Sequence, residues 1–290
     1  VLGYEADIGI ALDGDGDRDL LIARTGDVVR LTNRGTIGSN GTCNWLGLAA
    51  PEVVGTKLNL IEMQRVDMNG DGFADLAVRG TSNVVVWPGT ADGGFNSNDV
   101  REAASSPDYI YGFLASDLNG DGYGDVILST GLLDTFLGDA DDSYTFAGRS
   151  GTDGTPTAFL HEDLDKDGER EIVGLSLSST PVSILHWSAG TPPLVPAGRY
   201  FSGSLTRPGK PVVADFNGDG EKDLAYAGEF SAWLSVHWGP LTLPELSAPV
   251  TIALPSAPVD WQLLQPKGQP LTILMSSTTT RPATILRNLG

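Results

Sequence analysis

The chain has 290 residues, of which 40% are hydrophobic, and 37 acidic against 18 basic side chains give it a formal net charge of -19. This length allows one or two domains with a large core. The negative charge argues against nucleic acids and anionic membrane surfaces as partners, because binding them requires clustered Lys and Arg. No apolar run approaches the roughly 18 to 20 residues of a membrane span, so we expect no membrane insertion.

A short acidic motif recurs along the chain about every fifty residues. It is complete in the nine residues from Asp67, DMNGDGFAD, where Asp or Asn stands at positions 1, 3, 5 and 9. We expect a degenerate sixth copy near Gln265, which keeps the flanking apolar runs and Gly268 but has lost its acidic residues. The five recognisable copies begin at Ala11, Asp67, Asp117, Asp163 and Asp215.

Short β-rich runs flank each acidic loop, which predicts the order strand, tight loop, strand. The runs that follow the loops begin at Leu20, Leu76, Val126, Ile172 and Leu224. A third run, such as NVVVWPG or SVHWG, comes about ten residues later and usually ends in Gly. Stretches rich in Gly, Pro and Ser come next and are expected to hold a less regular fourth strand or loop. No helical period of ten residues or more is present.

Four short strands in about fifty residues, repeated, predict a β-propeller. We therefore expect an all-β fold of four-stranded antiparallel blades, six of them favoured and seven possible, in one domain over residues 1–290. The final run from Ala283 is predicted to be a third strand. Val1–Tyr4 is the candidate for the missing fourth strand, which would close the ring and remove the free sheet edges.

The composition of the loops predicts calcium sites between the first and second strands of the blades. Calcium takes about six to eight oxygen ligands, and carboxylates at alternate positions of a tight turn converge on one point. The carbonyl at position 7 would add a backbone oxygen, and Gly70 and Gly72 allow the positive φ that such a turn needs. An EF-hand is excluded because position 12, which should be Glu, is Val78, Leu128, Gly174 or Tyr226. The alternative is a set of ordinary Asx turns without metal.

We expect four to five calcium ions. The first loop has Ala11 at position 1 and should bind more weakly, and Lys166 replaces a glycine in the fourth loop. The predicted ligands are Asp13, Asp15, Asp17, Asp19, Asp67, Asn69, Asp71, Phe73, Asp75, Asp117, Asn119, Asp121, Tyr123, Asp125, Asp163, Asp165, Asp167, Glu169, Glu171, Asp215, Asn217, Asp219, Glu221 and Asp223.

The third copy, YGFLASDLNGDGYGDVIL from Tyr111, resembles the FG-GAP/VCBS repeats of integrin α-subunit β-propellers and of many secreted bacterial proteins. The resemblance covers five loops plainly and the whole chain by its period. It implies a propeller fold, bound calcium and a role in recognition or adhesion. It also implies that partners dock at the end opposite the metal loops.

No catalytic residues are predicted. The chain has three His residues and lacks the G-x-S-x-G and H-E-x-x-H motifs. Aromatic and His side chains recur at the end of the third run, and such groups suit a sugar ligand, although Trp at strand ends also packs between blades. The candidate ligand-binding residues are Trp87, His186, Trp187, His237 and Trp238.

We therefore expect a non-enzymatic, calcium-stabilised recognition or adhesion scaffold that is secreted or displayed at a cell surface. Its expected partner is an extracellular protein or a glycan, and it is taken as a monomer by default. A carbohydrate-binding propeller, or lectin, is the first alternative. An accessory binding domain of a larger secreted enzyme is the second.

Overall fold

The computed structural model describes the chain in fourteen ranges. Within them the protein is all-β, without a helix. No helix in this part of the chain could therefore cross a membrane. The described residues are 8–12, 18–24, 26–34, 36–37, 43–44, 46–56, 59–176, 182–200, 209–228, 233–244, 246–254, 258–264, 272–277 and 284–287.

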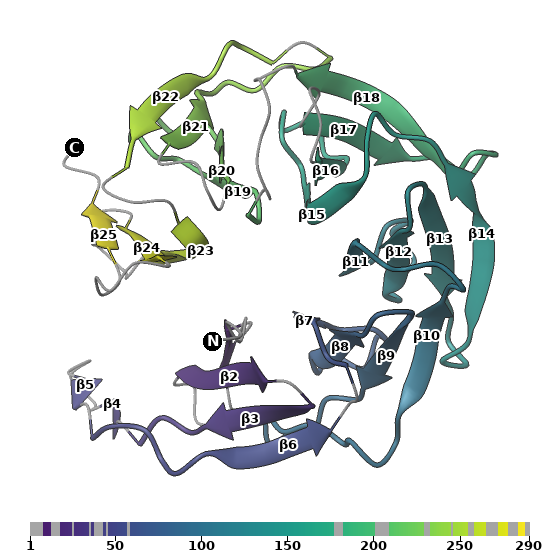
Figure 1. Cartoon of the computed structure of the whole chain (residues 1–290), viewed down its shortest axis with the longest axis vertical. Coiled ribbons are helices and arrows are strands. Elements are labelled where there is room, and N and C mark those ends of the chain that lie inside the picture. Colours follow the sequence, from purple (N-terminus) through teal and green to yellow (C-terminus); the bar gives the residue numbers. More distant parts are fainter. Residues whose placement is uncertain are drawn as a thin grey trace. The chain divides into compact units, whose positions relative to one another are not determined.

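Five four-stranded sheets follow one another along the chain, and within each the strands are ordered as in the sequence (Figure 1). Strand pairs with a described register are antiparallel. The first sheet is β1 (Ile8–Leu12), β2 (Arg18–Arg24), β3 (Asp27–Leu31) and β6 (Glu52–Thr56); the second is β7 (Glu62–Val66), β8 (Asp75–Arg79), β9 (Asn83–Trp87) and β10 (Arg101–Ser105); the third is β11 (Gly112–Ser116), β12 (Asp125–Ser129), β13 (Leu133–Gly138) and β14 (Tyr144–Ser150).

The later sheets continue the pattern. The fourth is β15 (Pro156–Glu162), β16 (Glu171–Ser176), β17 (Val182–Trp187) and β18 (Leu194–Tyr200), and the fifth is β19 (Val212–Ala214), β20 (Asp223–Ala227), β21 (Trp233–His237) and β22 (Val250–Ala253). A three-stranded sheet contains β23 (Pro258–Leu264), β24 (Thr272–Ser277) and β25 (Thr284–Arg287), and β4 (Thr36–Ile37) pairs with β5 (Cys43–Asn44).

These sheets confirm the predicted order of strand, loop, strand and third run, and they fit a propeller architecture. The final run forms β25, the third strand of its sheet, as expected. Val1–Tyr4, the candidate fourth strand, lies outside the described residues. The number of blades and the single domain over residues 1–290 stay predictions.

In the second to fifth sheets the second strand is the most buried. Every described residue of β8, β12, β16 and β20 is buried. By contrast, all four residues of β22, the last strand of its sheet, are exposed. Each buried second strand begins with the acidic residue at position 9 of the preceding loop.

Contacts divide the chain into two units. One comprises Val1–Ile110, Ala115–Leu128 and Thr135–Ala147, and the other comprises Tyr111–Leu114, Ser129–Asp134 and Gly148–Gly290. In the first unit a core cluster joins the first two sheets through residues such as Leu21, Val28 and Trp87. In the second unit the fourth and fifth sheets share a core that includes Val173, Ile184 and Tyr226.

Candidate metal loops and neighbouring residues

The acidic loops join the first strand of a sheet to the second. Val66 pairs with Asp75 at the base of the second loop, and Glu162 pairs with Glu171 at the base of the fourth. The predicted placement of the loops within each sheet is therefore found. The first loop, residues 13–17, lies outside the described residues, and so do the side chains of its four predicted ligands, Asp13, Asp15, Asp17 and Asp19.

The Asp at position 1 holds the loop backbone. In the second loop, Asp67 Oδ1 accepts the Gly70 N–H at 2.8 Å, and its Oδ2 accepts the Gly72 N–H at 2.9 Å. These glycines have φ angles of 72° and 85°, a left-handed conformation that glycine adopts without strain. The third and fifth loops repeat both bonds, from Gly120 and Gly122 to Asp117 and from Gly218 and Gly220 to Asp215.

The side chains at positions 3 and 5 also accept hydrogen bonds from the backbone of their own loop. The Asp71 N–H donates to Asn69 Oδ1 at 3.0 Å, and the Phe73 N–H donates to Asp71 Oδ1 at 2.7 Å. The third and fifth loops have the same bonds, through Asn119, Asp121, Tyr123, Asn217, Asp219 and Glu221. These are the Asx turns of the metal-free alternative. They remain compatible with a cation because each carboxylate oxygen keeps further lone pairs.

The carboxylate at position 9 is buried and connects three parts of its sheet. Asp125 Oδ2 accepts the Leu118 N–H of its own loop at 2.8 Å, and Oδ1 accepts the Gly138 N–H at the end of the third strand at 3.0 Å. Asp75 makes the corresponding bonds to Met68 and Gly89, and Asp223 makes them to Phe216 and Gly239. In these three repeats both oxygens of the acid therefore bind backbone.

The glycine that closes the third run is required by this contact. A Cβ atom on Gly89 would lie 2.5 Å from the Ala74 carbonyl oxygen, and one on Gly239 would lie 2.5 Å from that of Lys222. A Cβ on Gly138 would collide with the Gly124 carbonyl oxygen in the same way. The recurring glycine was visible in the sequence, but its partner at position 8 of the loop was not.

Burial raises the pKa of these carboxyl groups. The pKa of Asp125 rises to about 7, mainly because burial disfavours its charged form, although the two N–H donors from Leu118 and Gly138 oppose the shift. The pKa values of Asp75 and Asp223 are also raised, with burial as the largest cause. A nearby cation would favour the ionised form of all three groups.

The fourth loop differs because its carboxylates converge. Oxygen atoms of Asp163, Asp165 and Glu171 lie within 4.8 Å of one another, the one such group of three found among the described residues. Asp163 Oδ1 and Asp165 Oδ1 are buried without a hydrogen-bond partner. An unsatisfied buried oxygen is costly, so this arrangement fits a cation with oxygen ligands. The other acidic residues of this loop, Asp167 and Glu169, are exposed.

In the part of the chain that the structure describes, Glu171 also lacks the glycine contact that the other three position 9 acids make. The residue that follows the third strand of this repeat is Ser188, and its N–H donates to the Pro193 carbonyl at 2.8 Å. Glu171 Oε2 still accepts the Leu164 N–H at 2.9 Å. Within the described part of the chain, the Glu171 side chain thus makes one backbone hydrogen bond where the other position 9 acids make two. Burial raises the pKa of Glu171 to about 7, and the neighbouring carboxylates add to the shift.

Two lysines connect the fourth loop to the fifth. Lys166 adopts a φ of 64° where the other loops have glycine. Its Nζ donates to Glu221 Oε2 at 2.7 Å and to the Gly220 carbonyl at 3.1 Å. Lys222 donates in the other direction, to Glu162 Oε1 at 2.7 Å and to the Asp163 carbonyl at 2.8 Å. Lys166 thus gains ion pairing that offsets its unfavourable backbone conformation.

The five candidate ligand-binding residues lie at the same end of their sheets as the metal loops but differ in exposure. Trp87 and His237 are 1% and 0% exposed and belong to the core, as the packing alternative proposed. They present no surface to a ligand in this structure. His186, Trp187 and Trp238 are half-buried, which leaves part of each side chain accessible.

His237 is held as a neutral imidazole. Its Nδ1–H donates to the Ser247 carbonyl oxygen at 2.6 Å, so Nε2 accepts from the Tyr226 hydroxyl at 3.0 Å. Burial lowers its pKa below the ordinary value of 6.5. These contacts make His237 a packed residue of the fifth sheet.

Acidification below pH 6.5 is therefore expected to destabilise the protein through His237. The unfolded chain takes up the proton first, so the contribution of His237 is full above about pH 6.5 and is lost as pH falls toward the lower folded pKa, by up to about 1.4 kcal/mol per pH unit. Urea unfolding of the parent protein and of His237→Gln at pH 7 and pH 5.5 measures this loss as a difference, because the raised pKa values of Asp125 and Glu171 change stability in the opposite direction. The variant His237→Gln should lose less stability between the two pH values, and equal losses would contradict the assignment.

A comparison with protein-family models detects the repeat that the acidic loops indicate. The family model of the FG-GAP-like repeat matches residues 67–128 and 163–226, each of which contains two complete acidic loops. The search of curated proteins finds no match. The chain thus contains FG-GAP-like repeats at two places and is a β-propeller-like protein.

Solved structures of similar fold have little sequence identity. A functionally unknown protein from Desulfotomaculum acetoxidans has a TM-score of 0.60 and 17% identity, over 100% of this chain and 84% of that one. A lectin from Agrocybe aegerita, described as recognising non-reducing terminal N-acetylglucosamine, has a TM-score of 0.57 and 13% identity, over 99% and 80%. BBS1N in complex with ARL6DN has a TM-score of 0.55 and 12% identity, over 95% and 76%.

Proposed function

We propose that this FG-GAP-repeat chain is a non-enzymatic recognition scaffold, stabilised by calcium and working outside the cytosol. The observation that carries the proposal is the fourth loop, in which Asp163, Asp165 and Glu171 converge and two buried oxygens have no partner. Oxygen ligands of this kind suit a hard cation such as calcium. A calcium ion bound there would neutralise the negative charge of these three carboxylates.

The other complete loops are proposed as further sites. They hold the same residue types at the same positions, from Asp67, Asp117 and Asp215 onward. Calcium binding would exchange some of their internal hydrogen bonds for metal contacts. Because their position 9 carboxylates already bind two backbone N–H groups, we propose that these loops bind calcium more weakly than the fourth does.

The expected affinities favour a structural role for the metal. Extracellular calcium modules often bind at roughly 0.1 to 1 mM. At about 1 mM calcium, a site of 0.1 mM stabilises the folded state by about 1.4 kcal/mol. Several such sites would contribute a large part of the stability of a typical domain. Sites this weak require a calcium-rich compartment, which supports a secreted or cell-surface location.

The proposed partner is an extracellular protein or a glycan. The structural neighbours include a protein in complex with a protein partner, BBS1N with ARL6DN, and a lectin that recognises N-acetylglucosamine. Their fold thus accommodates both kinds of ligand, which supports a binding role here. The sequence offers no recognised catalytic motif, and a non-enzymatic role is part of the proposal. A lectin remains the second candidate, favoured by the partly exposed Trp187 and Trp238.

Calcium removal tests the proposal. With about 1 mM calcium present, adding excess EGTA is expected to lower the thermal midpoint, and Asp165→Asn should abolish roughly 3 to 5 °C of that shift, the share of one such site. Asp108→Asn, an exposed residue outside the loops, is the control and should keep the full shift. No EGTA effect on the parent protein would sink the calcium proposal. An unchanged effect in Asp165→Asn would remove the fourth loop from it.

A further inference from the structure

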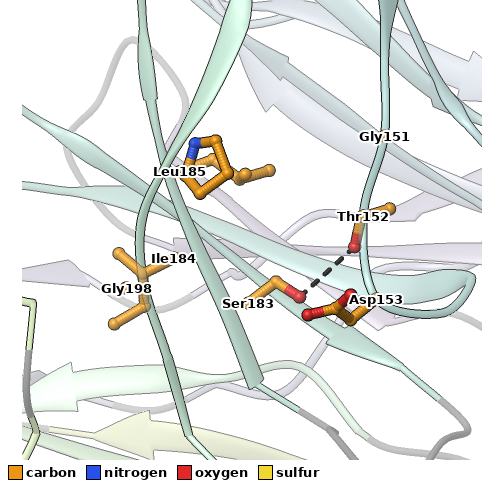
Figure 2. A pocket seen from close by; sticks show the side chains of 8 residues that line it. Gly151, Thr152, Asp153, Ser183, Ile184, Leu185 and Gly198 are labelled. Atoms are coloured by element: carbon orange, nitrogen blue, oxygen red, sulfur yellow. Dashed lines mark hydrogen bonds between the residues drawn. The ribbon is translucent and has the colours of Figure 1, made fainter.

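A pocket of about 260 Å³ lies in the fourth sheet, within the second unit (Figure 2). Its walls come from the connection between β14 and β15 and from the paired strands β17 and β18. Ser183 stands near the start of β17, whereas His186, near its end, pairs with Glu171 of the metal loop. Ser183 therefore lies toward the end of the sheet away from the metal loop. The lining residues are Gly151, Thr152, Asp153, Ser183, Ile184, Leu185, Pro196 and Gly198.

One side of the pocket is polar. The hydroxyl groups of Thr152 and Ser183 are 3.3 Å apart and share a hydrogen bond, which Figure 2 shows as a dashed line. Asp153 follows Thr152 in the chain and adds a carboxylate to the lining. Each hydroxyl can both donate and accept, and the bond between them is long. The pair can thus exchange this bond for hydrogen bonds to a ligand.

The rest of the lining is apolar or lacks side chains. Pro196 is exposed and supplies aliphatic surface, whereas Ile184 and Leu185 line the pocket but are only 0% and 2% exposed. A Cβ atom built on Gly151 would meet nothing within 4 Å, so this glycine borders open space. Gly198, in contrast, packs tightly, because its Cβ would lie 2.7 Å from the Pro244 carbonyl oxygen.

The backbone of the pocket is fixed by neighbouring contacts. The Leu194 N–H donates to the buried Ser150 Oγ at 3.0 Å, which ties the end of β14 to the start of β18. The register of β17 and β18 shifts between Ile184 and Leu185, whose partners are Gly198 and Pro196. Because proline has no N–H, the ladder lacks a donor opposite Leu185. The irregular pairing shapes the wall beside the hydroxyl groups.

We infer that this pocket binds one neutral monosaccharide unit of a glycan. Its volume is below the roughly 300 Å³ at which pockets for drug-sized ligands begin, so it suits a single ring. The hydroxyl groups of Thr152 and Ser183 and the carboxylate of Asp153 match the hydroxyls of a sugar. The exposed Pro196 ring offers an aliphatic contact to the C–H groups of the sugar. Anionic sugars are disfavoured by the net charge of -19. This inference rests on the proposed role as a binding scaffold and specifies its ligand.

Saturation-transfer NMR on the whole chain tests the inference. The probes are free glucose, galactose, mannose and N-acetylglucosamine, each at about 10 mM, since single-site affinities near 1 mM are expected for so small a ligand. At least one sugar should give a saturation signal. Glycerol, as a small polyol without a ring, should give none.

Three variants locate the binding. Gly151→Leu places a side chain in the open space and should reduce the affinity at least tenfold. Thr152→Val removes one hydroxyl at constant shape and should reduce it about fivefold. Thr145→Val, the same change at an exposed position of β14, is the matched control and should bind like the parent protein. Gly151 is exposed with a free Cβ direction, so folding of its variant is expected to be unaffected.

The inference is overturned if no sugar gives a signal, or if the signal survives in Gly151→Leu. A glycerol signal as strong as the sugar signal would also overturn it. The thermal response to EGTA is measured on the same samples. If this response is present while sugar binding is absent, the pocket inference fails and the proposed calcium-stabilised scaffold stands.

Discussion

Replacing Asp125 by alanine is expected to lower the free energy of unfolding by about 3 kcal/mol even when calcium is absent. The substitution leaves the buried N–H groups of Leu118 and Gly138 without an acceptor, and each such loss costs about 1 to 3 kcal/mol. Part of this cost is offset because a buried carboxyl with a pKa of about 7 is itself unfavourable when ionised at neutral pH. Urea unfolding in excess EGTA measures the difference.

Asp121→Ala in the same loop is the matched control. Asp121 is exposed, and its bonds to Asn119 and Tyr123 lie at the surface. In EGTA its loss should cost less than about 1 kcal/mol, whereas with calcium present it should lower stability further by removing a proposed ligand. Equal costs for the two variants in EGTA would show that the position 9 acid does not connect the loop to the third strand.

The repeat pattern predicted the strands well because local signals and the fold agree. Apolar runs on both sides of each acidic loop became the first and second strands of a sheet, and runs such as NVVVW became the third. The loop glycines also took the positive φ that the turn requires. These features depend on residues close in sequence, where a single chain carries the information.

Differences between loops could not be predicted in the same way. Lys166 and Glu171 made the fourth loop look less regular than its neighbours, yet its carboxylates are the ones that converge. Among the described residues, Glu171 lacks the backbone contact that the position 9 acids of three other repeats make to a glycine at the end of the third strand. The effect depends on which backbone atoms meet across strands, and the spacing of the acidic residues carries no information about that.

Burial likewise separated residues that look equivalent in the sequence. Trp87, Trp187 and Trp238 all end a third run, but Trp87 is enclosed while the other two are half-buried. The enclosing residue is Gly55 of β6, in the preceding sheet: a Cβ there would lie 2.8 Å from the Trp87 ring. The sequence alone does not show that Gly55 lies beside both Ser97 and the Trp87 ring.

Trp87→Ala is therefore expected to be the most destabilising of the substitutions considered, by about 3 to 5 kcal/mol. The ring packs with Leu21 and Val28 of the first sheet and with Leu76 of its own, so its loss opens a cavity where the two sheets meet. Denaturant unfolding with calcium present measures the effect. Trp233→Ala is the control. Trp233 is 54% exposed at the start of a third strand, so its replacement should cost less than about 1 kcal/mol.

If both variants were equally stable, Trp87 would not anchor this core, and the assignment of the third-run tryptophans to packing would need revision. If Trp87→Ala alone is destabilised, any ligand binding lost in that variant reflects unfolding, and tests of a sugar platform at this end of the sheets belong on Trp187 and Trp238.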